Sequence, residues 1–145
     1  MSAYADTGFL CSLYLPDAHT ARATARMARQ PLPLSFGWLH QLELRNALRL
    51  RVFRGEITPP QREAALNLLL ADLAGGVLAG ESPPHLAVMT EAERLSATHS
   101  ESLGTRSLDI LHVASALVLG APEFLTFDQR QARLASATGL RVPAL

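Results

Sequence analysis

Residues 4–10 read YADTGFL, a short apolar start that meets an acidic residue almost at the beginning of the chain. The stretch Ser2 to Ala5 predicts a strand, and Asp6 or Thr7 is a suitable N-cap for a helix that continues to about Tyr14. The charge therefore lies at the carboxyl end of a strand. In an open parallel α/β sheet, ligands bind beyond this end of the strands.

The remainder of the chain continues the alternation of strands and helices. Further strands are expected at residues 32–35, 77–78, 123–127 and 140–142, and helices at residues 18–29, 36–54, 58–74, 82–98, 108–119 and 129–138. Glycines at the junctions, including Gly75-Gly76 and Gly139, support these boundaries. Such alternation forms a parallel sheet with helices on both faces, so the predicted class is α/β, a three-layer α/β/α sandwich with a short, mainly parallel sheet. No linker or repeat interrupts the pattern, and residues 1–145 therefore predict one domain.

Composition excludes several function classes. All thirteen basic residues are arginine, and the absence of lysine excludes P-loop nucleotide hydrolysis and Schiff-base chemistry. Cys11 is the only cysteine, so one copy can form neither a disulfide nor a thiolate metal cluster. The formal net charge of zero argues against indiscriminate binding of polyanions. Because there is no signal-peptide pattern and no long apolar run, we expect a cytoplasmic protein with no membrane-spanning segment.

Two acidic residues lie at the ends of predicted strands. Asp6 follows the first strand, and Asp128 follows the strand at 123–127. Each also precedes a helix, where an aspartate accepts hydrogen bonds from free backbone N–H groups and stabilises the helix by about 1 kcal/mol. A capping role and a ligand role are compatible, so both stay open for these two residues.

Two further acidic residues lie on helix faces that should point inward. Glu43 is four residues from the apolar Leu39, and Asp109 is four residues from the apolar Val113, so each acid shares a face with core-forming side chains. A carboxylate that is buried without a partner costs several kcal/mol. Each acid must therefore be protonated, paired or bound to a cation.

Four carboxylates near one end of the sheet would repel one another unless a divalent cation lies between them. Oxygen ligands without histidine or cysteine favour a hard ion such as Mg²⁺ or Mn²⁺. The alternative for Glu43 is a salt bridge to Arg45 or Arg106.

The acidic stretches together resemble a known family. In chain order they are YADTGFL (4–10), LHQLELRNAL (39–48), RSLDILHVASAL (106–117) and FLTFDQRQARLA (124–135). Their order, separation and strand–helix context are similar to the four acidic motifs of PIN-domain ribonucleases, particularly the VapC-type toxins of bacterial toxin–antitoxin pairs. The likeness extends over essentially the whole chain.

The resemblance implies a PIN-like fold and an endoribonuclease that uses Mg²⁺ or Mn²⁺ to hydrolyse RNA phosphodiester bonds. It implies that the metal-binding quartet is Asp6, Glu43, Asp109 and Asp128. It also implies a homodimer or a larger toxin–antitoxin assembly, with a cognate antitoxin whose C-terminal segment lies in a groove between the first helices. Apolar residues there are compatible with such a groove and equally with the core: Phe9, Leu13, Tyr14 and Met27.

Other polar residues are candidates for the substrate side of the site. The resemblance places Thr7 and Thr126 beside the acids, and Arg106 and Arg130 are close in sequence to Asp109 and Asp128. Arginines at helical spacing, Arg22, Arg26 and Arg29, are read either as contacts to RNA phosphates or antitoxin acids or as a solvated face.

The histidines are interpreted without a catalytic role. His112 lies one turn from Asp109, but in so apolar a helix a packed core residue is the favoured interpretation over a general base. His19, His40, His85 and His99 show no metal-ligand spacing and are predicted to lie on the surface.

Two other functions remain open at this stage. One is a catalytically silent α/β protein-binding module, in which the acids serve as caps and salt bridges. The other is a PIN-like nuclease that acts on DNA instead of RNA.

Overall fold

The computed structural model describes residues 1–145 as an α/β fold with four short strands: β1 (Tyr4–Ala5), β2 (Leu34–Phe36), β3 (Leu78–Gly80) and β4 (Phe124–Leu125). β1 pairs in parallel with β4, and β2 pairs in parallel with β3. A parallel bridge between Ala3 and Leu34 connects the two pairs. The strand expected at 140–142 is reduced to a single bridge between Arg141 and Glu123, because the chain beyond Arg141 makes no further ladder.

The seven helices are α1 (Thr7–Tyr14), α2 (Thr20–Ala28), α3 (Trp38–Phe53), α4 (Pro59–Ala74), α5 (His85–Leu103), α6 (Ser107–Val118) and α7 (Gln129–Ala137). The helix predicted at 82–98 corresponds to α5, which continues five residues further, to Leu103. The first residue that stops α5 is Gly104, which adopts a left-handed conformation (φ 65°) that favours glycine. None of the helices has both the length and the apolar character needed to cross a membrane.

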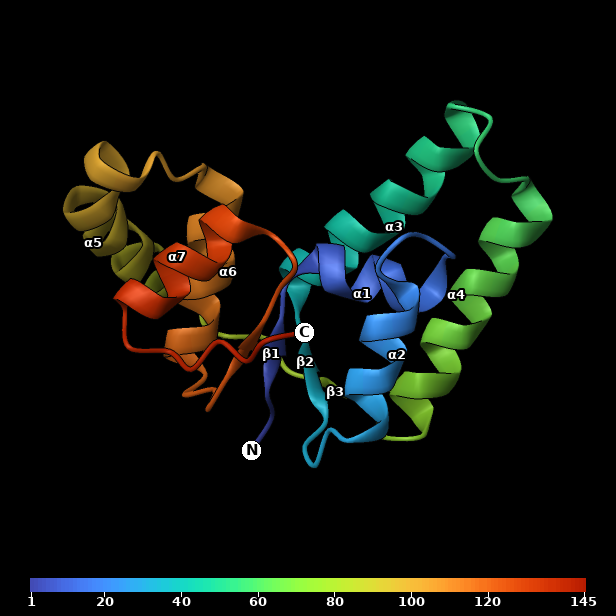
Figure 1. The fold of residues 1–145 in the computed structure, drawn as a ribbon, viewed down its shortest axis with the longest axis horizontal. Coiled ribbons are helices and arrows are strands. Elements are labelled where there is room, and N and C mark those ends of the chain that lie inside the picture. The colour runs from blue at the N-terminus through green and yellow to red at the C-terminus, as the bar shows by residue number, and fades with distance from the viewer.

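The helices form two layers, with the strands between them. Figure 1 shows α1 to α4 on one side of the strands and α5 to α7 on the other. Side chains alternate along β1 and β4 and so supply both layers: Ala5 and Leu125 belong to the core under α1 to α4, whereas Tyr4 and Phe124 belong to the core under α5 to α7. The predicted α/β class with parallel strands is confirmed.

The pairing of β1 with β4 fixes where the first and last acidic stretches lie. Ala5 is in register with Leu125, and the Asp6 N–H donates to the Leu125 carbonyl oxygen at 3.1 Å. Because the strands are parallel, both chains leave the sheet at the same edge. Asp6 and the 126–128 segment are therefore neighbours in space although about 120 residues separate them.

Candidate active site at the ends of β1 and β4

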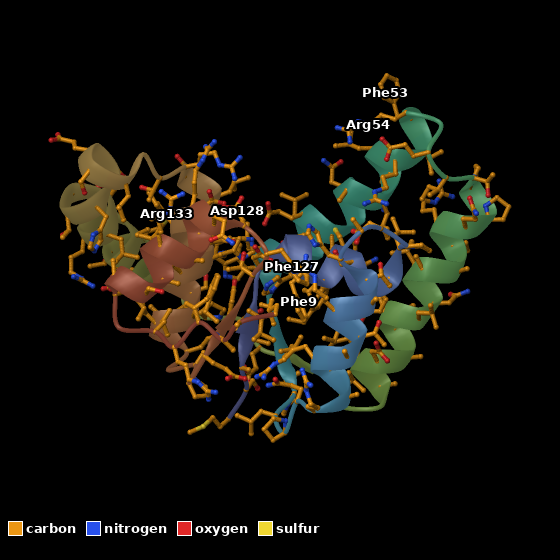
Figure 2. All side chains as sticks on the ribbon, viewed as in Figure 1. Phe9, Phe53, Arg54, Phe127, Asp128 and Arg133 are labelled. Atoms are coloured by element: carbon orange, nitrogen blue, oxygen red, sulfur yellow. The ribbon has the colours of Figure 1, made fainter.

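An open cavity of about 530 Å³ lies at the edge where β1 and β4 end. Figure 2 shows Asp128 and Phe127 near the junction of the two helical layers. The lining includes all four acids expected at the site, Asp6, Glu43, Asp109 and Asp128. Four segments far apart in the sequence thus bring their carboxylates to one cavity.

Asp6 is the most deeply held of these acids, with only 6% of its surface exposed. As the N-cap of α1 it accepts from the Phe9 N–H at 2.7 Å. Its second oxygen accepts from the Thr126 hydroxyl at 2.5 Å. Burial raises the pKa of the Asp6 carboxyl, while these two hydrogen bonds act in the opposite direction because they favour the ionised form.

Asp128 has the same capping role at the other strand end. Its Oδ1 accepts from the backbone N–H groups of Arg130 and Gln131 at 2.8 and 3.0 Å, at the start of α7. The Asp128 N–H in turn donates to the Thr126 hydroxyl oxygen at 3.0 Å. One buried hydroxyl, that of Thr126, therefore connects Asp6 with Asp128, and capping and cavity lining occur in the same residues.

Glu43 reaches the cavity from α3 and is bound by two side chains of other helices. The Thr7 hydroxyl donates to Glu43 Oε1 at 3.0 Å, and His112 Nε2 makes a close contact with the same oxygen. Burial alone would raise the pKa of Glu43, but the hydrogen bonds from His112 and from the Thr7 hydroxyl outweigh burial and lower the pKa. The arginine salt bridge considered for Glu43 is absent, because Arg45 bonds to Gln41 on its own helix.

His112 is a core residue, as interpreted, yet it is also part of the cavity wall. Only 3% of its surface is exposed. Tyr4 and His112 Nδ1 are hydrogen-bonded at 2.9 Å between the hydroxyl and the ring nitrogen. With the Tyr4 hydroxyl as donor to Nδ1, Nε2 carries the proton that faces Glu43. Tyr4, His112 and Glu43 therefore form a continuous hydrogen-bonded chain from the core to the cavity.

The prediction that His40 lies on the surface is wrong. Its ring is 1% exposed and lies 5.2 Å from the His112 ring, between centroids. The Gly37 N–H donates to Nδ1 at 3.1 Å, and Nε2 lies 2.8 Å from the Ala5 carbonyl oxygen. Burial lowers the pKa of His40 to about 3, so the ring is neutral and bonds α3 to β1. The spacing of the histidines did not predict this burial, because spacing alone does not show that α3 turns His40 toward the strands.

Asp109 and Asp128 share one arginine. Arg106 Nε donates to Asp109 Oδ2 at 2.9 Å, and its Nη2 donates to Asp128 Oδ2 at 3.3 Å. Arg106 is itself 59% exposed along its side chain, so its charge is screened by solvent. The residue expected on the substrate side thus occupies the position of a counter-ion between two acids.

The other candidates are placed differently from the acids. Thr7 lines the cavity. Thr126 is buried, and its hydroxyl donates a hydrogen bond to Asp6. Arg130 is exposed outside the cavity lining and contributes only its backbone N–H to Asp128.

The donor set fits a hard divalent cation in its chemistry but not as a closed cage. No three acidic, histidine or cysteine side chains lie close enough to hold an ion between them. Mg²⁺ characteristically keeps several waters and uses one or two carboxylates together with substrate phosphates. An open cavity lined by carboxylates suits that mode. Asp6, Glu43, Asp109 and Asp128 are the residues that would hold it.

Sequence reasoning missed two polar residues, Tyr4 and the buried Gln131, and the contact of His112 with Glu43. Gln131 lines the cavity and its side-chain amide donates to the Asp109 carbonyl oxygen at 3.4 Å. Its position three residues after the Asp128 cap was the only available signal. Tyr4 and His112 are 108 residues apart and carry no shared pattern.

The comparisons with known proteins identify the fold. No protein-family model matches the chain, and no curated protein matches it. Among solved structures, VapC20 of Mycobacterium tuberculosis, a toxin that cleaves the sarcin–ricin loop, matches with a TM-score of 0.70 at 21% identity, covering 96% of this chain and 96% of that one. FitAcB from Neisseria gonorrhoeae matches with a TM-score of 0.63 at 17% identity, covering 98% of this chain and 96% of the other.

VapBC2 from Rickettsia felis, bound to a DNA fragment from its promoter, matches with a TM-score of 0.66 at 14% identity, covering 99% of this chain and 98% of the other. Each match extends over almost the full length of both chains. The chain therefore has the fold of VapC-type PIN domains.

Proposed function

We propose that this protein is an endoribonuclease that depends on Mg²⁺ or Mn²⁺ and acts as the toxin of a toxin–antitoxin pair. The observation that carries the proposal is the convergence of Asp6, Glu43, Asp109 and Asp128 on one open cavity. The fold shared with VapC20, a toxin that cleaves the sarcin–ricin loop, supports the same proposal.

A bound divalent cation would supply charge stabilisation for the phosphodiester oxygens and make a water easier to deprotonate. The chain's own residues orient the site. Asp6 and Asp128 are fixed at the strand ends by backbone N–H groups, and both residues line the cavity. Thr7 and His112 hold the Glu43 carboxylate in place and keep it ionised. Such orientation by surrounding hydrogen bonds is characteristic of metal-supporting acids.

Arg106 has two states in this scheme. In the structure it neutralises Asp109 and Asp128, which lowers their mutual repulsion. With a bound cation beside Asp109 and Asp128, the exposed guanidinium of Arg106 would no longer be needed as their counter-ion. It could then pair with an RNA phosphate in the bidentate manner typical of arginine.

The proposal includes a partner and an assembly. FitAcB and VapBC2 are toxin–antitoxin complexes with this fold, and we propose a cognate antitoxin for this chain also. Phe9 and Tyr14 are buried in the core, so an antitoxin groove at the first helices would have to use partly exposed residues such as Leu13 and Met27. A homodimer in the cytoplasm is part of the same proposal.

Cleavage of a labelled RNA tests the proposal directly. Wild-type protein with Mg²⁺ should cut single-stranded RNA in preference to single-stranded DNA of the same sequence, and chelation by EDTA should stop the reaction. Asp6→Asn should abolish most of the activity, whereas Glu63→Gln, the matching change at an exposed acid of α4, should not. Equal cleavage by wild type and Asp6→Asn would refute the assignment, and preference for DNA would support the DNA-directed alternative.

The silent binding module is favoured by one specific observation. Each of the four acids already accepts a hydrogen bond or an ion pair within the protein, so none of them is left without a polar partner when no cation is bound. A thermal shift with Mn²⁺ separates the two readings. A rise in melting temperature that disappears in Asp6→Asn supports a metal site, and the absence of any shift supports the silent module.

A further inference from the structure

A second cavity, of about 680 Å³, adjoins the acid cavity. His19 and Phe127 line both, so the two spaces share a wall. The second cavity is otherwise formed by α2, by α7 and by the C-terminal segment from Val142 to Leu145. We call it the arginine groove and define it by His19, Arg22, Phe127 and Arg133.

The two adjoining cavities have opposite charge. Five carboxylates line the acid cavity: Asp6, Asp17, Glu43, Asp109 and Asp128. No acidic side chain lines the arginine groove, where Arg22 and Arg133 are the charged side chains. Both arginines are exposed and neither makes a salt bridge. The groove is therefore suited to a polyanion that the acid cavity by itself would repel.

The shared wall, His19 and Phe127, belongs to a stack of three rings that also includes Phe9. Phe9 and Phe127 stack at 5.5 Å between centroids, and His19 stacks on Phe127 at 4.4 Å with only 10° between the planes. The His19 ring is half-buried, which leaves it as the outermost plane of the stack.

Arg22 fixes this arrangement. Its guanidinium carbon lies 5.0 Å from the Phe127 ring centroid, and its Nη2 donates to His19 Nδ1 at 2.7 Å. A flat ring held in place beside two cationic groups is the combination that proteins use for single-stranded nucleic acids, in which bases stack and phosphates pair.

We propose that the arginine groove binds the stretch of single-stranded RNA that continues from the acid cavity, with phosphates on Arg22 and Arg133 and a base stacked on His19. The proposal deepens the ribonuclease function above and rests on it for the identity of the strand. The continuity of the two cavities at His19 and Phe127 supplies the path. An acidic protein segment would match the charge but not the stacked ring, so RNA is the better fit.

The test measures RNA binding separately from cleavage. The full chain is titrated against a 5′-fluorescein-labelled single-stranded RNA in EDTA, with fluorescence anisotropy as the readout over a series of NaCl concentrations. Arg22→Ala with Arg133→Ala should raise Kd at least tenfold at low salt. It should also reduce the slope of log Kd against log salt by about 1.4, since each phosphate contact on a single strand contributes about 0.7.

The matched control removes the same charge elsewhere. The control is Arg54→Ala with Arg62→Ala: Arg54 directly follows α3, and Arg62 belongs to α4. Figure 2 shows Arg54 beyond the tip of α3, away from Phe127 and Arg133. This control should leave the affinity and the salt slope close to those of wild type. Unchanged melting temperatures in both double variants establish that folding is preserved.

A second pair of variants tests the stacked ring. His19→Ala should weaken RNA binding about tenfold, and His19→Phe should restore it, because any aromatic ring can stack on a base. His19 makes no side-chain capping bond to α2, so neither change removes a helix cap.

The outcomes decide the two proposals independently. Wild-type affinity and slope in the Arg22 and Arg133 double variant would overturn the groove, even if the protein cleaves RNA. Loss of binding to poly-glutamate without loss of RNA binding would also overturn it, in favour of an acidic protein partner. If RNA binds through these arginines but is not cleaved with Mg²⁺, the groove stands and the ribonuclease assignment fails.

Discussion

The two sides of the acid cavity hold their carboxylates in different ways. On the inner side, formed by β1, α1 and α3, Asp6 and Glu43 are bonded to partly or fully buried groups of the protein, among them Thr126 and His112. On the outer side, formed by α6 and α7, Asp109 and Asp128 share the exposed Arg106. Both sides present oxygen to the same space.

The difference indicates that the two sides hold their carboxylates with different rigidity. Buried partners in a low dielectric hold a side chain in one geometry, and their loss leaves polar groups without partners. An exposed guanidinium is screened by water and can be displaced at little cost. The inner side therefore provides a fixed framework, whereas the outer side is held by a contact that is easier to break.

The largest effect is expected on the inner side at Asp6. Asp6→Asn should reduce RNA cleavage by about 10³-fold, because it removes a charge from the proposed cation site. The amide still caps α1, so the fold survives. Burial raises the pKa of the Asp6 carboxyl, which means that the ionised form destabilises the folded chain as pH rises toward neutrality. The melting temperature at pH 7 should therefore stay equal or increase, as measured by differential scanning fluorimetry.

The corresponding substitution on the outer side, at Asp128, tests whether the two sides differ in function. Asp128→Asn should reduce cleavage by only about 10- to 100-fold, in keeping with the loss of a supporting acid rather than a fixed ligand. Equal losses in Asp6→Asn and Asp128→Asn would show that the two sides are not functionally different.

The next largest effect is expected on stability, at His112. His112→Ala should destabilise the fold by about 3 kcal/mol, because it leaves a cavity and removes the partner of Tyr4 and Glu43. For a chain of this size the melting temperature should fall by about 10 °C. His99→Ala, at a half-buried position of α5 with no side-chain hydrogen bond, is the control. A loss at His112 no greater than at His99 would contradict the fixed inner framework.

A smaller loss of stability is expected when the Tyr4 hydroxyl is removed. Tyr4→Phe removes only the hydroxyl that bonds His112 and should cost about 1 kcal/mol. Tyr4 and His112 share one hydrogen bond, so the Tyr4→Phe/His112→Ala double variant should lose less stability than the sum of the losses in the two single variants. Urea unfolding of the four proteins in this cycle measures the coupling, and strict additivity would show that the hydrogen-bonded chain carries no energy.

The smallest effect on stability is expected on the outer side, at Arg106. Arg106→Ala should change the melting temperature by no more than about 2 °C, since the ion pairs with Asp109 and Asp128 are exposed. It should however increase the affinity for Mn²⁺ several-fold, because the competing positive charge is gone. Mn²⁺ titration by electron paramagnetic resonance measures this, with Arg130→Ala as the matched control. Unchanged or weaker Mn²⁺ binding would show that Arg106 does not occupy the position of the cation.

Much of the fold followed from local signals. Caps such as Thr58 and Asp128, and breakers such as Gly55 and Gly104, act within about four residues, so helix starts were predictable from neighbouring positions. The end of α5 was placed five residues too early, although Gly104 marks it, because the prediction did not use that glycine. The strand near 140–142 was overestimated for a different reason: whether an extended segment becomes a strand depends on a partner that local sequence does not reveal.

The candidate site was predictable in its acids and not in their partners. Asp6 and Asp128 stand at strand ends, and Glu43 and Asp109 stand on apolar faces, so the pattern pointed all four to one edge. His40 was assigned to the wrong environment, and the contact of His112 with Glu43, 69 residues away, had no counterpart in the sequence pattern.

The α/β class, the parallel strands and the order of the acidic stretches could be predicted from the sequence. These features depend on hydrophobic periodicity and on helix caps, which act between residues that are close in the chain. Tertiary structure alone decided that Tyr4 bonds His112, that Arg106 spans two acids, and that an arginine groove adjoins the acid cavity. Those contacts join side chains of separate elements, and they depend on how the helical layers pack against the strands, which no short stretch of sequence specifies.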